Sequence, residues 1–111
     1  MIYLFTGDDA DEKRKAYENL LKSLDGEVLQ ISKDSFDRMQ IESLYSGAGL
    51  FAPKFIIVFT GVLEYEEIRD FILDKLALLA ESQSNFIFLE GKLLKPIIDS
   101  FKKARAEINA F

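Results

Sequence analysis

The stretch Phe55-Ile56-Ile57-Val58-Phe59 decides the fold class, because it has no polar residue at any position. A strand that is apolar on both of its faces is typical of a parallel sheet covered by helices on both sides. Thr60-Gly61 ends this run, and two similar apolar runs occupy residues 2–5 and 86–89. We predict that all three runs are buried strands of one sheet.

Helical patterns separate these strands. Apolar residues recur at helical spacing over residues 64–81, between residues 9 and 25, over residues 36–45, and after Pro96, which suits the first turn of a helix. The expected inward faces are Tyr17, Leu20, Leu21 and Leu24; Phe36, Met39, Ile41 and Leu44; Tyr65, Ile68, Ile72, Leu76 and Leu79; and Leu94, Ile97, Ile98 and Phe101.

Two weaker strands complete the pattern. Residues 27–31 alternate in polarity, as in an edge strand, and residues 107–111 form a fifth strand. Strands and helices therefore alternate along the whole chain, which indicates right-handed crossovers and a mostly parallel sheet. We predict one α/β domain over residues 1–111, a three-layer αβα arrangement with a five-stranded sheet.

Composition excludes several classes of chemistry. The chain contains no cysteine and no histidine, so disulfides, zinc-thiolate sites, histidine metal sites and histidine acid–base catalysis are excluded. The longest apolar run has five residues, and residues 1–20 lack the pattern of a signal peptide. We expect a cytoplasmic protein with no membrane partner.

Charge is distributed unevenly along the chain. Residues 1–90 carry 9 basic and 17 acidic groups, whereas residues 91–111 carry 5 basic and 2 acidic groups. The acidic part argues against a domain that wraps nucleic acid, so any DNA contact is expected to be weak or indirect. The basic segment 92–105 is interpreted as a solvated helix face. Alternatively, it touches a nucleic-acid backbone, or it is the surface on which a regulatory domain binds a protein partner.

The first strand–helix turn is the place where a parallel α/β fold would bind phosphate. A phosphate loop needs the pattern G-x-x-x-x-G-K-[ST], but residues 7–14 read Gly-Asp-Asp-Ala-Asp-Glu-Lys-Arg. Glu12 and Lys13 take the Gly-Lys positions, and acidic side chains at a helix N-terminus repel a phosphate. We therefore expect no nucleotide cofactor.

An alternative reading is a degenerate Mg²⁺-dependent phosphotransferase or receiver-like domain. It would use Asp8 and Asp9, with Glu90 after a later strand. A receiver also needs a phosphate-accepting aspartate at the end of the third strand, where this chain has Thr60. We interpret Asp8 and Asp9 as the acidic start of a helix and Glu90 as a strand-end residue, and we expect no metal site.

The segment that precedes the third strand reads Ser46-Gly47-Ala48-Gly49-Leu50-Phe51-Ala52-Pro53. Its two glycines weaken any helix, and they are followed by two large apolar side chains. Leu50 and Phe51 either complete the core below the strand or form an apolar plug for a partner.

Taken together, these segments resemble the N-terminal domain of the delta subunit of the bacterial DNA polymerase III clamp loader. The resemblance rests on the opening residues 2–9, on Leu44 with residues 50–58, on Gly91-Lys92-Leu93, and on the closing residues 106–111. It spans essentially the whole chain, through an ordered combination of short motifs. It implies an AAA+ type fold, related to P-loop NTPases, without a functional phosphate loop.

The resemblance also implies a function. Delta subunits, which belong to the DNA polymerase holoenzyme, open the sliding clamp (the beta subunit) by inserting an apolar pair into a clamp pocket. By position that pair is Leu50 and Phe51, flanked by Ser46, Gly49 and Ala52. The expectation is a non-catalytic clamp-binding domain in DNA replication, with no catalytic residues. Family members add a helical lid and a collar that joins other clamp-loader subunits, and we expect neither of these domains within residues 1–111.

Overall fold

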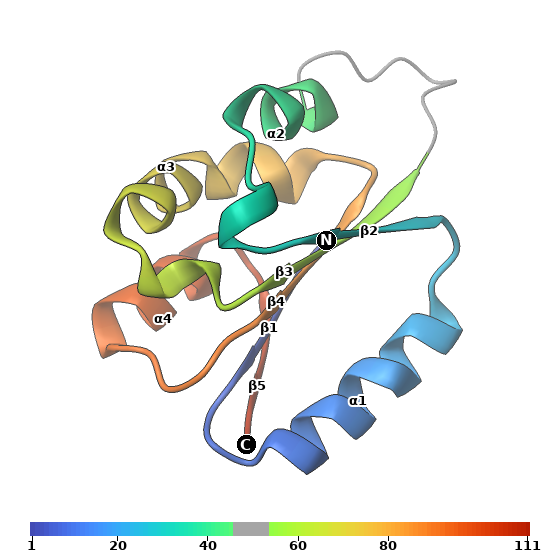
Figure 1. The fold of residues 1–111 in the computed structure, drawn as a ribbon, viewed down its shortest axis with the longest axis vertical. Coiled ribbons are helices and arrows are strands. Elements are labelled where there is room, and N and C mark those ends of the chain that lie inside the picture. The colour runs from blue at the N-terminus through green and yellow to red at the C-terminus, as the bar shows by residue number, and fades with distance from the viewer. Residues whose placement is uncertain (46–53) are drawn as a thin grey trace.

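Five parallel strands form one sheet in the order β2-β3-β4-β1-β5 (Figure 1). A computed structural model of the chain describes residues 1–45 and 54–111. The strands are β1 (Ile2–Thr6), β2 (Glu27–Ile31), β3 (Phe55–Thr60), β4 (Asn85–Leu89) and β5 (Glu107–Ala110). Every described pairing is parallel, as the apolar runs predicted, and β2 is an edge strand.

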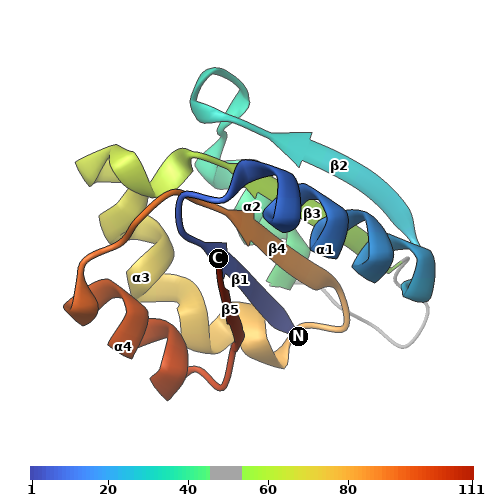
Figure 2. The ribbon, with the colours of Figure 1, turned by 90° about the horizontal axis from the view of Figure 1, so that it is seen from below.

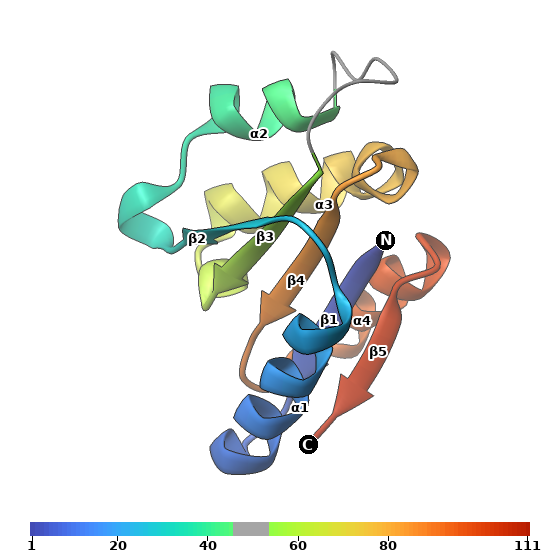
Figure 3. The ribbon, with the colours of Figure 1, turned by 90° about the vertical axis from the view of Figure 1, so that its right-hand side faces the viewer.

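Helices cover both faces of the sheet, which confirms the three-layer αβα arrangement. Helix α1 (Ala10–Ser23) lies on one face, whereas α2 (Arg38–Tyr45), α3 (Glu66–Glu81) and α4 (Lys95–Lys103) lie on the other (Figures 2 and 3). The reason is the direction of the crossovers. The connection from β1 to β2 runs across the sheet one way and the other three run the opposite way, so right-handed crossovers place their helices on opposite faces. None of the helices in the described residues is long and apolar enough to cross a membrane.

The core lies mainly between the sheet and helices α2, α3 and α4. The rings of Phe59 and Phe88 stack with centroids 4.6 Å apart, and Phe101 of α4 meets Phe88 edge-on at 5.1 Å. A smaller cluster on the other face joins Phe5, Val58 and Ile87 to the apolar side of α1. Thus the central strands are buried on both sides, and their sequence needs no polar face.

Three predicted inward residues lie elsewhere: Tyr65 and Leu94 precede the helices to which they were assigned, whereas Met39 lies within α2 on its exposed side. Met39 is 78% exposed, because α2 buries Ile41 and a side chain two positions away points to the other side of the helix. Tyr65 precedes α3 in an extended conformation and lies beneath the Lys33 ammonium. Leu94 is the residue before α4 and is 73% exposed. The other predicted faces of α1, α3 and α4 are buried or half-buried.

The aromatic stack predicts where the domain is most sensitive to mutation. Phe88→Ala should lower the free energy of unfolding by about 3–5 kcal/mol, since it empties a fully buried site between two other rings. Urea denaturation measures this loss. Val28→Ala, on the exposed side of an edge strand, is the control and should cost less than about 1 kcal/mol. Equal losses in both variants would contradict this description of the core.

Candidate functional site

The carboxyl ends of β1 and β4 form the position where ligands bind in parallel α/β folds. These strands are neighbours, but the chain leaves β1 toward α1 and leaves β4 toward α4, on opposite faces of the sheet (Figure 2). Such a topological switch point leaves a crevice outside the strand ends. Its contents therefore decide whether the domain can hold a nucleotide.

The turn after β1 is enclosed by the chain's own backbone. The Thr6 hydroxyl donates to the carbonyl oxygen of Gly91 at 2.6 Å, and the Gly7 amide donates to the same oxygen at 3.2 Å. The Asp8 amide donates to the carbonyl oxygen of Phe111 at 3.1 Å. Gly7 has φ +116°, and a Cβ there would overlap this Phe111 carbonyl, so only glycine fits. These amides are not free to cradle a phosphate.

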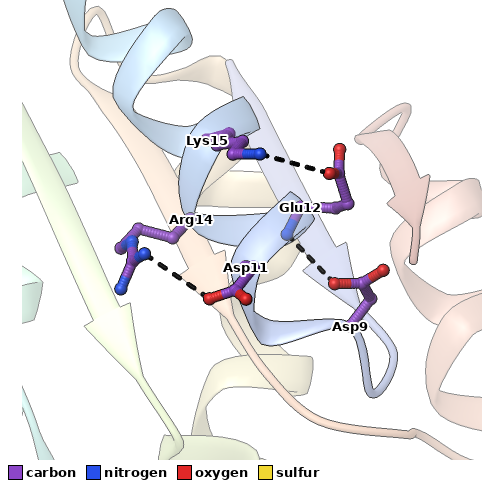
Figure 4. Close-up of polar contacts among 5 residues, drawn as sticks. All are labelled: Asp9, Asp11, Glu12, Arg14 and Lys15. Atoms are coloured by element: carbon purple, nitrogen blue, oxygen red, sulfur yellow. Dashed lines mark hydrogen bonds and ion pairs between the residues drawn. The ribbon is translucent and has the colours of Figure 1, made fainter.

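The first turn of α1 is occupied by acidic side chains (Figure 4). Asp9 caps the helix, and its Oδ1 accepts the Glu12 amide at 3.1 Å. Asp11 and Glu12 pair with Arg14 and Lys15, each at 3.5 Å. The carboxylates thus complement the positive end of the helix dipole, as the sequence predicted. They occupy the helix N-terminus, where an anionic ligand would otherwise bind.

Lys13 fills the crevice from the side of α1. Its ammonium donates to the carbonyl oxygen of Glu90 at 2.7 Å and to that of Gly7 at 3.0 Å. This residue stands where a phosphate loop has the lysine that reaches the phosphates. Here the lysine binds the strand ends themselves, and it links the turn after β1 to the turn after β4.

Glu90 is the buried acid of this edge. It is 2% exposed, and its two carboxylate oxygens accept the amides of Val62 at 3.2 Å and Leu63 at 3.0 Å, in the short 3₁₀ turn η2 (Val62–Glu64). Burial raises the pKa of Glu90 from 4.5 to about 7; the nearby charge of Glu64 acts in the same direction, and the backbone hydrogen bonds oppose it. The carboxylate therefore holds η2 against the end of β4.

A cavity of about 350 Å³ lies beside these groups, between α1 and the ends of β3 and β4. Its lining includes Tyr17, Thr60 and Gly61 together with Lys13 and Glu90. The charged groups of Lys13 and Glu90 already have hydrogen-bond partners within the domain. Arg14 also lines the cavity, and its guanidinium makes an exposed pair with Asp11 at 3.5 Å.

The structure places the acids of the Mg²⁺ alternative in separate contacts. Asp8 pairs with Lys92 at 3.0 Å, Asp9 caps α1, and Glu90 binds η2. Within residues 1–45 and 54–111, no three acidic side chains gather to hold a metal ion. The strand order also differs from the 2-1-3-4-5 order of flavodoxin-like folds such as receivers, because β1 lies between β4 and β5.

The residues predicted to bind a partner lie outside the described part of the chain. These are Ser46, Gly49, Leu50, Phe51 and Ala52.

The described residues on either side of them belong to the opposite, amino edge of the sheet. The Ser82 hydroxyl donates to the Leu44 carbonyl at 3.3 Å, and the Phe55 amide donates to the Ser84 hydroxyl at 3.1 Å. One turn, between α3 and β4, therefore fixes both flanks of segment 46–53.

No protein-family model matches this chain, and no curated protein matches it significantly. The geometry is therefore the main guide to the site. The sequence placed Lys13 in the phosphate-loop comparison and Glu90 at a strand end, with Glu90 also in the Mg²⁺ alternative, but it predicted neither the contacts of Lys13 with the strand ends nor those of Glu90 with η2. The signal for Lys13 was its place in the failed phosphate-loop pattern, and the signal for Glu90 was an acid directly after a wholly apolar strand.

Replacing the lysine tests the closure of the carboxyl edge. Lys13→Met keeps the apolar stem but leaves two carbonyl groups without their charged donor, so the free energy of unfolding should fall by about 2 kcal/mol. Urea denaturation measures the change. Lys15→Met, which breaks only an exposed pair on the same helix, should change stability by less than about 0.5 kcal/mol. A Lys13 variant as stable as its control would contradict the closure.

Glu90 predicts a pH dependence of stability. Its pKa is higher in the folded state than in the unfolded chain, so the folded state binds more protons between pH 4.5 and about 7. The contribution of Glu90 protonation to the free energy of unfolding is full below pH 4.5, and it is lost as the pH rises through about 7. Glu90→Gln should remove this decline in the free energy of unfolding, measured by urea denaturation between pH 4 and pH 8.

The exposed Glu42→Gln is the matched control, since it makes the same chemical change on α2 and should keep the decline. The quantity compared is the slope of the free energy of unfolding against pH. Its absolute value is not compared, because the glutamine side chain in Glu90→Gln also changes the hydrogen bonds to η2. An unchanged slope in Glu90→Gln would contradict the assignment.

Proposed function

We propose that this chain is a non-catalytic protein-binding domain of the clamp-loader delta type. It binds the bacterial DNA sliding clamp, the beta subunit, through the apolar pair Leu50 and Phe51, and it acts in DNA replication. Ser46, Gly49 and Ala52 flank the pair and complete the contact. The domain needs no cofactor and hydrolyses no nucleotide.

The observation that carries the proposal is the closed carboxyl edge. Lys13 binds the carbonyl groups of Gly7 and Glu90 at the switch point, and the first turn of α1 is capped by Asp9. A nucleotide would have to displace both the lysine and the acidic side chains. A parallel α/β domain whose ligand crevice is held by its own groups is better suited to bind a partner at another surface.

The amino edge supplies a suitable base for that surface. Leu44 and Phe55 are both tied to the turn at residues 82–84, and Ser84 is 4% exposed. A segment displayed from two fixed flanks loses less conformational freedom on binding than one on a free tail. The sequence resemblance adds that segment 46–53 carries the leucine–phenylalanine pair.

The remaining partners follow from the same resemblance. In a longer protein with a lid and a collar, other clamp-loader subunits would join through the collar, and the clamp would stay the partner of this domain. We place the protein in the cytoplasm, where replication takes place in bacteria. DNA contact is weak or indirect, because the domain carries a net charge of −5.

Binding to purified sliding clamp tests the proposal. Burial of a leucine and a phenylalanine contributes roughly 1.5–3 kcal/mol each, so Leu50→Ala/Phe51→Ala should weaken binding by about a hundredfold or more in a calorimetric titration. The matched control is Met39→Ala/Leu94→Ala, which truncates two exposed apolar side chains elsewhere and should bind like the wild type.

Urea denaturation of the same variants separates docking from core packing. If Leu50 and Phe51 belong to the core, their truncation will unfold or strongly destabilise the domain. Retained stability with lost clamp binding is the expected result. Clamp binding that is equal in the two double variants would contradict the proposal.

A further inference from the structure

Three basic residues at the end of α4 are unused by the contacts described so far. Lys102, Lys103 and Arg105 are all exposed. Among residues 1–45 and 54–111, none of these side chains takes part in an ion pair, although Lys92 and Lys95 at the other end of the helix do. Lys102, Lys103 and Arg105 therefore form an exposed basic cluster on a domain that is otherwise acidic.

A groove runs beside this basic cluster. It has a volume of about 360 Å³ and lies between α3 and α4, lined by Ala77, Ala80, Glu81, Lys103, Ala104 and Arg105. The alanines leave room for an incoming side chain. A second hollow of about 250 Å³ shares Ala77, Lys103 and Ala104 and extends the groove to Leu73 and Leu76. The groove thus has an apolar floor and a basic rim.

Arg105 is held in an unfavourable backbone conformation beside the groove. It is the only residue other than glycine with a positive φ in the described part of the chain, at 62°. The Arg105 amide donates to the Lys102 carbonyl and the Ala106 amide to the Phe101 carbonyl, each at 3.0 Å. This is the Schellman arrangement, in which glycine normally occupies the left-handed position. Arginine there lowers stability, which indicates a use for its side chain.

The groove lies at the same edge of the sheet as the flanks of segment 46–53. Met1 and Ile2, at the start of β1, line the groove. The Met1 amino group donates to the Ser84 carbonyl, and the Ser84 hydroxyl accepts the Phe55 amide. In Figure 3 the start of β1 lies between the start of β3 and the connection from α4 to β5. A partner bound at one place can therefore reach the other.

We propose that the α3–α4 groove and its basic rim form a second contact site for the protein partner that binds Leu50 and Phe51. This inference rests on the proposed function. The occupant is a surface of the sliding clamp that carries acidic side chains around an apolar residue. The acidic side chains pair with Lys103 and Arg105, and the apolar residue enters between Ala77, Ala80 and Ala104.

A protein surface suits the groove better than nucleic acid. Glu81 lines the groove together with Lys103 and Arg105, and Asp99 lies on α4 four residues before Lys103. A continuous row of phosphates would be brought against both acids, whereas a protein can match interspersed charges of either sign.

Charge reversal with a matched control tests the site. Lys103→Glu/Arg105→Glu should weaken binding to purified sliding clamp by about tenfold or more, with a smaller dependence on salt. Lys92→Glu/Lys95→Glu makes the same change in net charge at the carboxyl edge, and it should bind like the wild type. Leu50→Ala/Phe51→Ala is measured alongside, so that the two sites are scored separately.

Arg105→Gly separates binding from folding. Glycine relieves the left-handed backbone, so this variant should unfold at a higher urea concentration than the wild type and yet bind the clamp more weakly. A merely structural arginine would give a more stable domain with unchanged binding, and that result would overturn the proposal.

The remaining outcomes are distinct. Weakened binding in Leu50→Ala/Phe51→Ala, but equal binding in the two charge-reversal variants, overturns the second site and leaves the proposed function standing. No clamp binding by the wild type overturns both. Binding of a fluorescent DNA duplex that is lost only in Lys103→Glu/Arg105→Glu, with clamp binding unchanged, would assign the groove to nucleic acid instead.

Discussion

The Lys13 ammonium makes the contact on which this account of the domain depends. Its two hydrogen bonds join the turn after β1 to the turn after β4, the two places where a parallel α/β sheet opens to a ligand. The same turns are joined again by the Thr6 hydroxyl and the Gly7 amide on Gly91. The lysine that would contact a phosphate in a phosphate loop is here part of the fold, and for this reason we propose a function at another surface.

The two edges of the sheet differ in how their polar groups are used. At the carboxyl edge, Asp8, Asp9, Lys13 and Glu90 are all satisfied within the domain. At the amino edge, the turn at residues 82–84 fixes the flanks of segment 46–53, while Lys103 and Arg105 remain open to solvent. This division agrees with the proposed function, in which the carboxyl edge is held by internal contacts and the partner binds at the opposite edge.

Much of the fold could be predicted from the sequence. The strands at residues 55–59 and 86–89 are apolar throughout, which is typical of a parallel sheet covered by helices on both faces. The strand order could not, because pairing joins residues far apart, such as Leu4 with Phe88 and Ile108. Tyr65 and Leu94 were misplaced because a helix start depends on local caps that periodicity does not show, and Met39 was misplaced because α2 buries the face of Ile41. The binding of Lys13 to Glu90 was beyond prediction for the same reason as the strand order, since 77 residues separate them.

Hydrogen–deuterium exchange of the domain, alone and with saturating sliding clamp, tests the central claim most directly. If the amino edge is the binding surface, amide exchange should slow in peptides that cover residues 42–56 and 101–106, whereas peptides over residues 6–14 and 88–92 should be unchanged. Protection confined to the turns after β1 and β4, or no protection anywhere, would contradict the account.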